Sequence, residues 1–166
     1  MTLPRFYHPG STDATASTIV LGADEAHHLT HVLRLRAGDA VLLFDGRGTQ
    51  YRGTVATAGR TGATIDRHEP VPAAAELPIT ITLCQALLKA EGMDEVVRDA
   101  TMLGVAVIQP VVAARSVLPA QASRQATVLE RWRRVALASV KQCGRAVLPR
   151  IEHPRSLAEI LGERVG

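Results

Sequence analysis

Short hydrophobic runs separated by glycine and aspartate dominate the first 66 residues, and this pattern is typical of β-strands. The sequence Asp45-Gly46-Arg47-Gly48 between two such runs is a strong hairpin signal. The pattern predicts strands at residues 6–7, 18–21, 40–44, 51–56 and 63–66. One helix is expected at residues 24–35, with an inward face made of Ala26, Leu29, Val32 and Leu33. This combination favours a small β-barrel.

After residue 66 the hydrophobic pattern no longer indicates short β-strands. Residues 67–78 hold three prolines and three consecutive alanines and have no apolar periodicity, which favours an interdomain linker. We therefore expect a barrel domain at residues 1–68, a linker at 69–78 and a second domain at 79–166.

The second domain has the pattern of a parallel α/β sheet. Strands are expected at residues 79–84, 105–112 and 148–152, and a short helix at 156–161. A helix at 91–103, ended by Gly104, would bury Met93, Val96, Val97, Ala100 and Leu103. A second helix, from an N-cap at Ser123 to about residue 142, would bury Leu129, Trp132, Val135, Ala136, Ser139 and Val140. The whole chain is thus α/β, and its second part is about half of a typical α/β domain.

Charge is distributed unevenly along the chain. Residues 1–72 are neutral, whereas residues 112–150 carry eight basic side chains against Glu130 alone, a net charge of +7. On a helical wheel Arg124, Arg131, Arg134 and Lys141 lie opposite the apolar face. Two interpretations stay open, a cationic stripe that meets a polyanion and a solvated helix face.

The other motifs that could indicate metal binding, nucleotide binding or catalysis give weak signals. His27 and His31 are spaced i, i+4 on one helix face, but no third metal ligand is placed by spacing, so RNA contact or packing is favoured for these histidines over a metal site. The glycines near Gly46 lack the strand-turn-helix context of a dinucleotide site, and no phosphate-binding loop or nucleophile elbow occurs in the sequence. The residues by themselves indicate an anion-binding protein without catalytic machinery.

Cysteine content and the N-terminus bear on location. Cys84 and Cys143 are too few and too far apart for a zinc knuckle or a disulfide framework, and their small or apolar neighbours favour buried thiols. The N-terminus lacks the pattern of a signal peptide, and no apolar run is long enough to span a membrane. A soluble cytoplasmic protein without a membrane partner is expected.

Several motifs, in their order along nearly the whole chain, resemble one known family. They are Pro4-Arg5-Phe6-Tyr7, the run from His27 to Arg34, Phe44-Asp45-Gly46, the stretch from Gln85 to Met93, Leu103-Gly104-Val105, Ile108-Gln109-Pro110, and Arg131-Trp132 through Gln142-Cys143-Gly144-Arg145. The chain resembles the RsmE-type ribosomal RNA uridine-N3 methyltransferases of bacteria. The resemblance implies an N-terminal PUA-like barrel that binds RNA and a C-terminal SPOUT domain with a trefoil knot. It also implies S-adenosylmethionine as cofactor, small-subunit (16S) ribosomal RNA as substrate, and a homodimer in the full-length form.

The two cofactor loops of that family are missing from the sequence. Neither the Gly-Pro-Glu-Gly-Gly loop nor the later loop with Leu-Arg occurs in the 166 residues. On this resemblance the chain is the barrel with the first half of the SPOUT domain, without the knot region and without cofactor-binding residues. We expect it to transfer no methyl group by itself.

The resemblance also assigns RNA contacts, residue by residue. On the barrel these are Arg5, His28, Arg34 and Arg36. On the second domain they are Gln85, Lys89, Arg115, Gln142 and Arg145, to which the cationic stripe adds Arg131 and Arg134. No catalytic base and no metal ligand is assigned. The chain departs from the family at Asp99, Met102 and Lys141, where the family commonly has Lys, Glu and Glu.

Three hypotheses follow. The first is an RNA methyltransferase of which this chain supplies the RNA-binding part and half of the catalytic domain. The second is an RNA-binding module that works without catalysis. The third, a nucleotide-dependent metabolic enzyme, is disfavoured by the missing phosphate loop.

Overall fold

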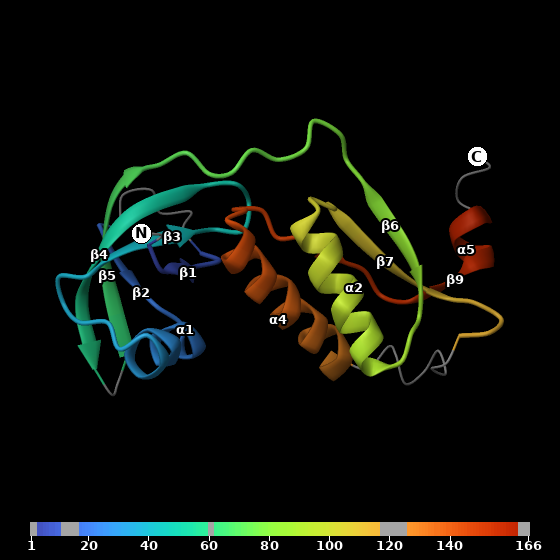
Figure 1. Cartoon of the computed structure of the whole chain (residues 1–166), viewed down its shortest axis with the longest axis horizontal. Helices are drawn as coiled ribbons and strands as arrows, with labels where there is room; N and C mark the ends of the chain where they lie inside the picture. Colours follow the sequence, from blue (N-terminus) through green and yellow to red (C-terminus); the bar gives the residue numbers. More distant parts are fainter. Residues whose placement is uncertain (1–2, 11–16, 60–61, 117–125, 163–166) are drawn as a thin grey trace. The chain divides into compact units, whose positions relative to one another are not determined.

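The structure, a computed structural model, describes residues 3–10, 17–59, 62–116 and 126–162. The chain folds into two compact units (Figure 1). Unit 1 contains residues 1–75 together with 144–147, and unit 2 contains residues 76–143 and 148–166. The chain therefore passes from one unit to the other three times.

Unit 1 is built on a five-stranded sheet. Its strands are β1 (Arg5–Tyr7), β2 (Thr18–Val20), β3 (Ala40–Phe44), β4 (Gln50–Gly59) and β5 (Gly62–Pro70). Their order is β1-β3-β4-β5-β2, and every pair is antiparallel except β1 with β3. All five predicted strands are confirmed. Strand β5 runs to Pro70, however, into the stretch expected to be a linker, because residues 66–67 still pair with β4 and Tyr51 pairs with Pro70.

The helix of unit 1 departs from the predicted face. It begins as α1 (Ala23–His27) and continues as a π-helical turn, η1 (His28–Val32). Ala26 and Leu29 are buried as expected, but Val32 is 59% and Leu33 39% exposed. The wider π-turn rotates the later side chains away from the face that a regular 100° step predicts. Leu35 packs against the core of unit 1 in their place.

Residues 144–147 add a short segment to unit 1 that the sequence pattern did not predict. The Gly48 N–H donates to the Ala146 carbonyl at 3.1 Å, and Val147 forms single bridges with Gly46 and Arg47. The hairpin signal around Gly46 therefore marks a site where a distant part of the chain is held by its backbone. Such pairing carries no side-chain pattern from which it could be predicted.

Unit 2 contains a parallel sheet of short strands. They are β6 (Thr82–Ala86), β7 (Val107–Val112), β8 (Arg150–Ile151) and β9 (Arg155–Ser156). Strand β7 lies in the middle, with β6 on one side and β8 and then β9 along the other. The predicted β-α-β-α-β order is confirmed, with β9 as an unpredicted addition.

Three helices belong to unit 2 in the part of the chain that the structure describes: α2 (Ala90–Met102), α4 (Ala126–Cys143) and α5 (Leu157–Gly162). Helices α2 and α4 pack side by side and cover one face of the sheet (Figure 1). Leu129, Trp132, Ala136, Ser139 and Val140 are buried as the helical period predicts. Leu103 is 75% exposed, contrary to the prediction, because α2 ends at Met102 and Gly104 then adopts a φ of +92°. The expected N-cap Ser123 lies outside the described residues.

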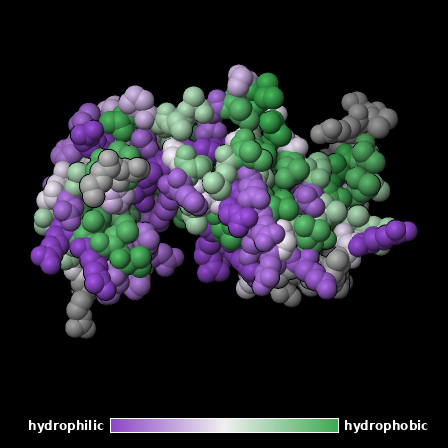
Figure 2. Space-filling model, in the orientation of Figure 1, coloured by the Kyte–Doolittle hydropathy of each residue, from purple (hydrophilic) through white to green (hydrophobic). Residues whose placement is uncertain are grey.

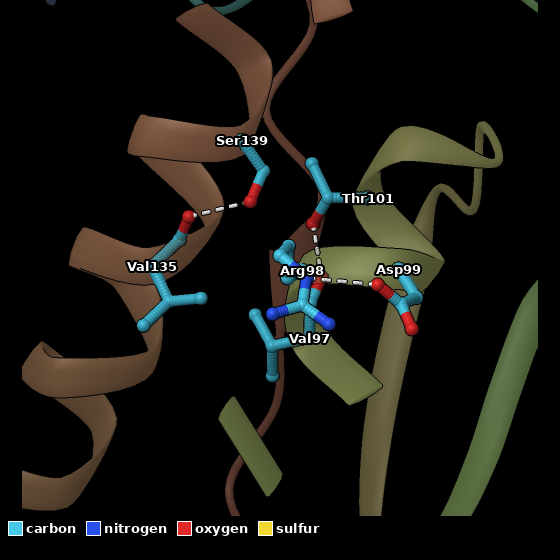
Figure 3. A network of polar contacts seen from close by, with 6 residues as sticks. All are labelled: Val97, Arg98, Asp99, Thr101, Val135 and Ser139. Carbon is cyan, nitrogen blue, oxygen red and sulfur yellow. Dashed lines mark hydrogen bonds and ion pairs between the residues drawn. The ribbon is translucent and has the colours of Figure 1, made fainter. Parts of the chain in front are cut away.

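Two hydroxyl groups are buried on the packed helices, one on α2 and one on α4. Thr101 is fully buried and Ser139 is 3% exposed. Figure 3 shows that each hydroxyl turns back on its own helix, Thr101 to the carbonyl of Val97 at 2.6 Å and Ser139 to that of Val135 at 2.8 Å. Each hydroxyl thereby donates to a carbonyl of its own helix, which allows the apolar face to close around it.

The opposite face of the sheet is open among the described residues. Thr82 and Cys84 of β6 and Val107 and Gln109 of β7 line a depression of about 500 Å³ on this face. Cys84 is therefore exposed, and the prediction of a buried thiol is wrong for it, whereas Cys143 is half-buried. None of the helices described in the chain is both long and apolar enough to cross a membrane.

Candidate nucleic-acid interface

The π-turn of unit 1 brings several predicted RNA contacts to one surface. His28 is half-buried and packs edge-on against Phe6, with 6.2 Å between ring centroids. Arg34 and Arg36 follow the turn and are exposed. They line a depression of about 330 Å³ together with Thr30, His31, Leu35 and the end of β4. Of the predicted contacts on unit 1, these two arginines are the accessible cations.

Arg5 lies inside unit 1. It is 7% exposed, and its guanidinium donates to the Gln50 Oε1 at 2.8 Å and to the Arg145 carbonyl at 2.7 Å. The guanidinium also lies over the Phe44 ring, 4.8 Å from its centroid. Arg145 itself is 6% exposed. Both residues were predicted to contact RNA, and their burial instead gives them a role inside the unit.

Aromatic packing next to Arg5 affects Tyr7. Its ring lies 5.5 Å from the Phe44 ring, and its backbone N–H donates to Glu25 at 3.3 Å. Burial raises the pKa of the Tyr7 phenol above its ordinary value, while Arg47 lowers it and Asp45 raises it by smaller amounts. The phenol is therefore held in its neutral form.

In unit 2 three predicted contacts gather at the carboxyl edge of the sheet. Gln85 lies at the end of β6, Lys89 is exposed just before α2, and Arg115 is exposed shortly after β7. The two strands end together, since Ala86 is opposite Val111 and the Leu87 N–H donates to the Val111 carbonyl at 2.9 Å. Ligands of parallel sheets bind beyond this edge.

The cations of α4 are less free than the local charge excess indicates. Arg131 donates from Nε to Asp94 Oδ2 at 2.8 Å and pairs with the same oxygen through Nη2. Arg133 pairs with Glu130 at 3.0 Å. Asp94 belongs to α2, so a sequence window restricted to residues 112–150 does not include it. Arg134 and Gln142 are exposed, and Arg124 lies outside the described residues.

An acidic depression lies beside Arg131. Its volume is about 360 Å³, and it is lined by Glu91, Asp94, Glu95, Arg98 and Val135. Hydrophilic side chains cover much of the outer face of α2 and α4 (Figure 2).

Asp99 is one of the three positions at which the chain departs from the family pattern. At the end of α2, Arg98 donates to Asp99 at 2.9 Å (Figure 3), so this carboxylate is paired with its neighbour. The ion pair with Asp99 also raises the pKa of Arg98.

The charged groups around the unit 2 sheet are mostly cationic. The carboxyl edge of the sheet offers Gln85, Lys89 and Arg115, which are neutral or cationic. The open sheet face is lined by Arg150, His153 and Arg155 with Glu152 paired to Arg150 at 2.5 Å. Among the described residues no three potential ligands are grouped to hold a metal ion.

Comparisons with known proteins agree with this two-unit architecture. Residues 75–165 match the family model described as an RNA methyltransferase domain, and residues 21–66 match the one described as an RNA methyltransferase PUA domain. Ribosomal RNA small subunit methyltransferase E of Synechocystis sp. is 31% identical over 150 residues, which are 90% of this chain and 48% of that protein. The enzyme of the same name from Mycobacterium bovis is 34% identical over 142 residues, 83% of this chain and 52% of that protein.

Two solved structures share the fold. Ribosomal RNA small subunit methyltransferase E from Neisseria gonorrhoeae, bound to S-adenosyl methionine, has a TM-score of 0.88 and 29% identity, covering 96% of this chain and 65% of that one. The putative methyltransferase Lpg2936 from Legionella pneumophila, in complex with the same cofactor, has a TM-score of 0.91 at 24% identity, covering 98% and 67%. The chain spans about half the length of the curated relatives that it matches. Since the RNA methyltransferase domain model covers more than half of its residues, the chain belongs to that RNA methyltransferase family.

Proposed function

We propose that the protein to which these residues belong methylates N3 of a uridine in small-subunit ribosomal RNA, with S-adenosylmethionine as the methyl donor. The observation that carries the proposal is the pairing, in one chain, of a PUA match with an RNA methyltransferase match. The 29% identical relative from Neisseria gonorrhoeae, whose structure contains the cofactor, supports the choice of donor. We place this activity in the cytoplasm.

In this proposal the described residues bind and orient RNA. Arg34 and Arg36 supply fixed cations on unit 1. Lys89, Arg115 and Gln85 supply polar contacts at the carboxyl edge of the unit 2 sheet, and Arg134 and Gln142 supply further ones on α4. Arginine is suited to this work because its planar guanidinium binds a phosphate through two parallel hydrogen bonds.

The chemistry itself needs residues beyond those described. We propose that residues 1–166 alone bind RNA but neither bind S-adenosylmethionine nor transfer its methyl group, because they lack both cofactor loops of the family. Isothermal titration calorimetry of S-adenosylmethionine into residues 1–166 should give no binding heat, while a ribosomal RNA hairpin should bind. Micromolar cofactor binding would overturn this assignment.

A second candidate function is an RNA-binding module without catalysis, which the same missing loops favour. The nucleotide sequence downstream of codon 166 separates the two. An in-frame continuation into a Gly-Pro-Glu-Gly-Gly-like loop supports the methyltransferase. A stop codon there would support the module.

We further propose that the whole methyltransferase is a homodimer, on the strength of the family resemblance. Light scattering of the full-length protein should give twice the mass of one chain. A monomeric mass at the concentrations where the protein is active would contradict this.

A further inference from the structure

The backbone around Arg34 is unusual. Among the described residues Arg34 is the one non-glycine residue with a positive φ, at 54°. It directly follows the π-turn, where the Leu33 N–H bonds the His28 carbonyl and the Leu35 N–H bonds that of Leu29, both at 3.0 Å. A left-handed conformation is unfavourable for an L-residue other than glycine. Such outliers and π-turns both concentrate at binding sites, which directs attention to what Arg34 lines.

Arg34, Arg36 and His31 line the same depression of about 330 Å³. No carboxylate is among its described lining residues, in contrast to the depression beside α4 with Glu91, Asp94 and Glu95. Within the described parts of the chain, neither guanidinium makes an ion pair or a side-chain hydrogen bond. Asp39, the nearby acid, accepts from the backbone N–H of Arg36 at 2.7 Å. Two free cations therefore share a depression that suits an anion.

The His31 ring is held in one orientation by His27 and Thr30. Its ring stacks on that of His27, with 4.5 Å between centroids and 11° between planes. The Thr30 hydroxyl lies 2.7 Å from Nδ1 of His31 and 2.8 Å from the Ala26 carbonyl. With the single hydroxyl proton given to that carbonyl, the tautomer of His31 that fits the contact carries its proton on Nδ1. The neutral ring is then left with Nε2 as an acceptor.

We propose that this depression is a ribose-phosphate subsite for RNA. Arg34 and Arg36 donate to a phosphodiester group, and Nε2 of His31 accepts a hydrogen bond from the ribose 2′-hydroxyl. The 2′-hydroxyl is the group by which proteins distinguish RNA from DNA, so His31 supplies discrimination and the arginines supply affinity. This inference rests on the proposed RNA-binding function and deepens it.

The test separates these two roles by comparing a short fluorescein-labelled RNA with a DNA of the same sequence. Fluorescence anisotropy with residues 1–166 gives the affinity for each over a range of salt. Arg34→Asn removes the charge and keeps a residue that tolerates the left-handed conformation. It should weaken RNA and DNA alike by about 3- to 10-fold and lower the salt slope by about one. His31→Phe retains a ring for the stack on His27 but removes the acceptor. It should lower the affinity for RNA to that for DNA and leave DNA binding unchanged.

Controls keep the outcome unambiguous. Arg52→Gln removes one charge from β4 of the same unit, outside the depression, where Arg52 pairs with Glu69 at 3.7 Å. Arg34→Gly, which also suits a positive φ, repeats the arginine test if the asparagine variant misfolds by circular dichroism. The subsite is overturned if Arg34→Asn weakens RNA binding no more than Arg52→Gln, or if His31→Phe leaves the preference for RNA intact.

Two further outcomes distinguish failure of the subsite from failure of the proposed RNA-binding function. If the unaltered protein binds RNA but the variants behave as it does, only the subsite is lost and the proposed function stands. If the unaltered protein binds no RNA, the RNA-binding role of unit 1 and the subsite fall together. Inorganic phosphate provides the last arm, because submillimolar phosphate binding without RNA binding would indicate a site for the free anion and overturn the proposal.

Discussion

The guanidinium of Arg5 donates a 2.7 Å hydrogen bond to the backbone carbonyl of Arg145, which follows it by 140 positions in the sequence. The same guanidinium binds Gln50 and lies over the Phe44 ring, so one buried cation connects β1, β3 and β4 to residues 144–147. A buried charge is tolerated only with such partners. Arg5 therefore positions a segment that the chain reaches only after completing α4.

Replacing Arg5 should release that segment. Arg5→Met retains much of the apolar stem but leaves the Arg145 carbonyl and Gln50 without their donor, which should lower the free energy of unfolding of unit 1 by about 2–4 kcal/mol. Hydrogen exchange of the Gly48 amide, which donates to the Ala146 carbonyl, reports on the segment directly and should accelerate. Arg52→Met, at an exposed site, should change stability by less than about 0.5 kcal/mol. Unchanged Gly48 exchange in Arg5→Met would contradict the assignment.

Local periodicity predicted much of this fold. The buried positions of α4 and the order of strands and helices in unit 2 follow from an uninterrupted 3.6-residue period and from one continuous apolar run. The prediction failed at Val32 and Leu33 because the π-turn changes the angular step partway through the helix. A single-period pattern cannot indicate where that change occurs.

The candidate site was less predictable, for a different reason. The sequence identifies cations but not their burial or their partners, so Arg5 and Arg145 were assigned to RNA although both are buried. Likewise Arg131 was counted as free because Asp94 precedes it by 37 positions. His31 was noticed for its spacing to His27, but its tautomer depends on a hydroxyl contact that only the folded helix creates.

Gly104 provides a test of how α2 ends. Its φ of +92° is disfavoured for other residues, and an added Cβ would lie 2.9 Å from Leu77 Cδ1. Gly104→Ala should therefore lower the free energy of unfolding of unit 2 by about 1–3 kcal/mol, measured by urea denaturation. Gly162→Ala is the matched control, since nothing lies within 4 Å of its added Cβ, and it should be near neutral. Equal effects of the two substitutions would refute the strain argument.

Tyr7 provides a prediction about pH. Since burial raises the pKa of its phenol, the folded state keeps the proton to higher pH than the unfolded state does. The stabilising contribution is complete below about pH 10 and is lost as pH rises through the folded-state pKa. Titration of phenolate absorbance should show a late phase that Tyr7→Phe removes. A late phase that persists in Tyr7→Phe would assign it to another group.

The pairing of Arg131 with Asp94 predicts unequal roles for the cations of α4. Arg134 is exposed and has no acidic partner among the described residues, whereas Arg131 shares its charge with Asp94. Arg134→Gln should therefore weaken RNA binding more than Arg131→Gln does. Asp94→Asn should strengthen RNA binding by about 2- to 5-fold, because it removes a negative charge that neutralises Arg131 and repels phosphate.

A double-mutant cycle tests that explanation rather than the ranking alone. If Asp94 masks Arg131, then Arg131→Gln costs more RNA affinity in the Asp94→Asn background than in the unaltered protein, because the guanidinium is then free to meet phosphate. Fluorescence anisotropy with a ribosomal RNA hairpin gives the four affinities, and thermal unfolding checks that each variant is folded. Additive effects would mean that the ion pair does not control access to Arg131. The charge excess of α4 would then act on RNA as a whole, with no distinction between paired and unpaired arginines.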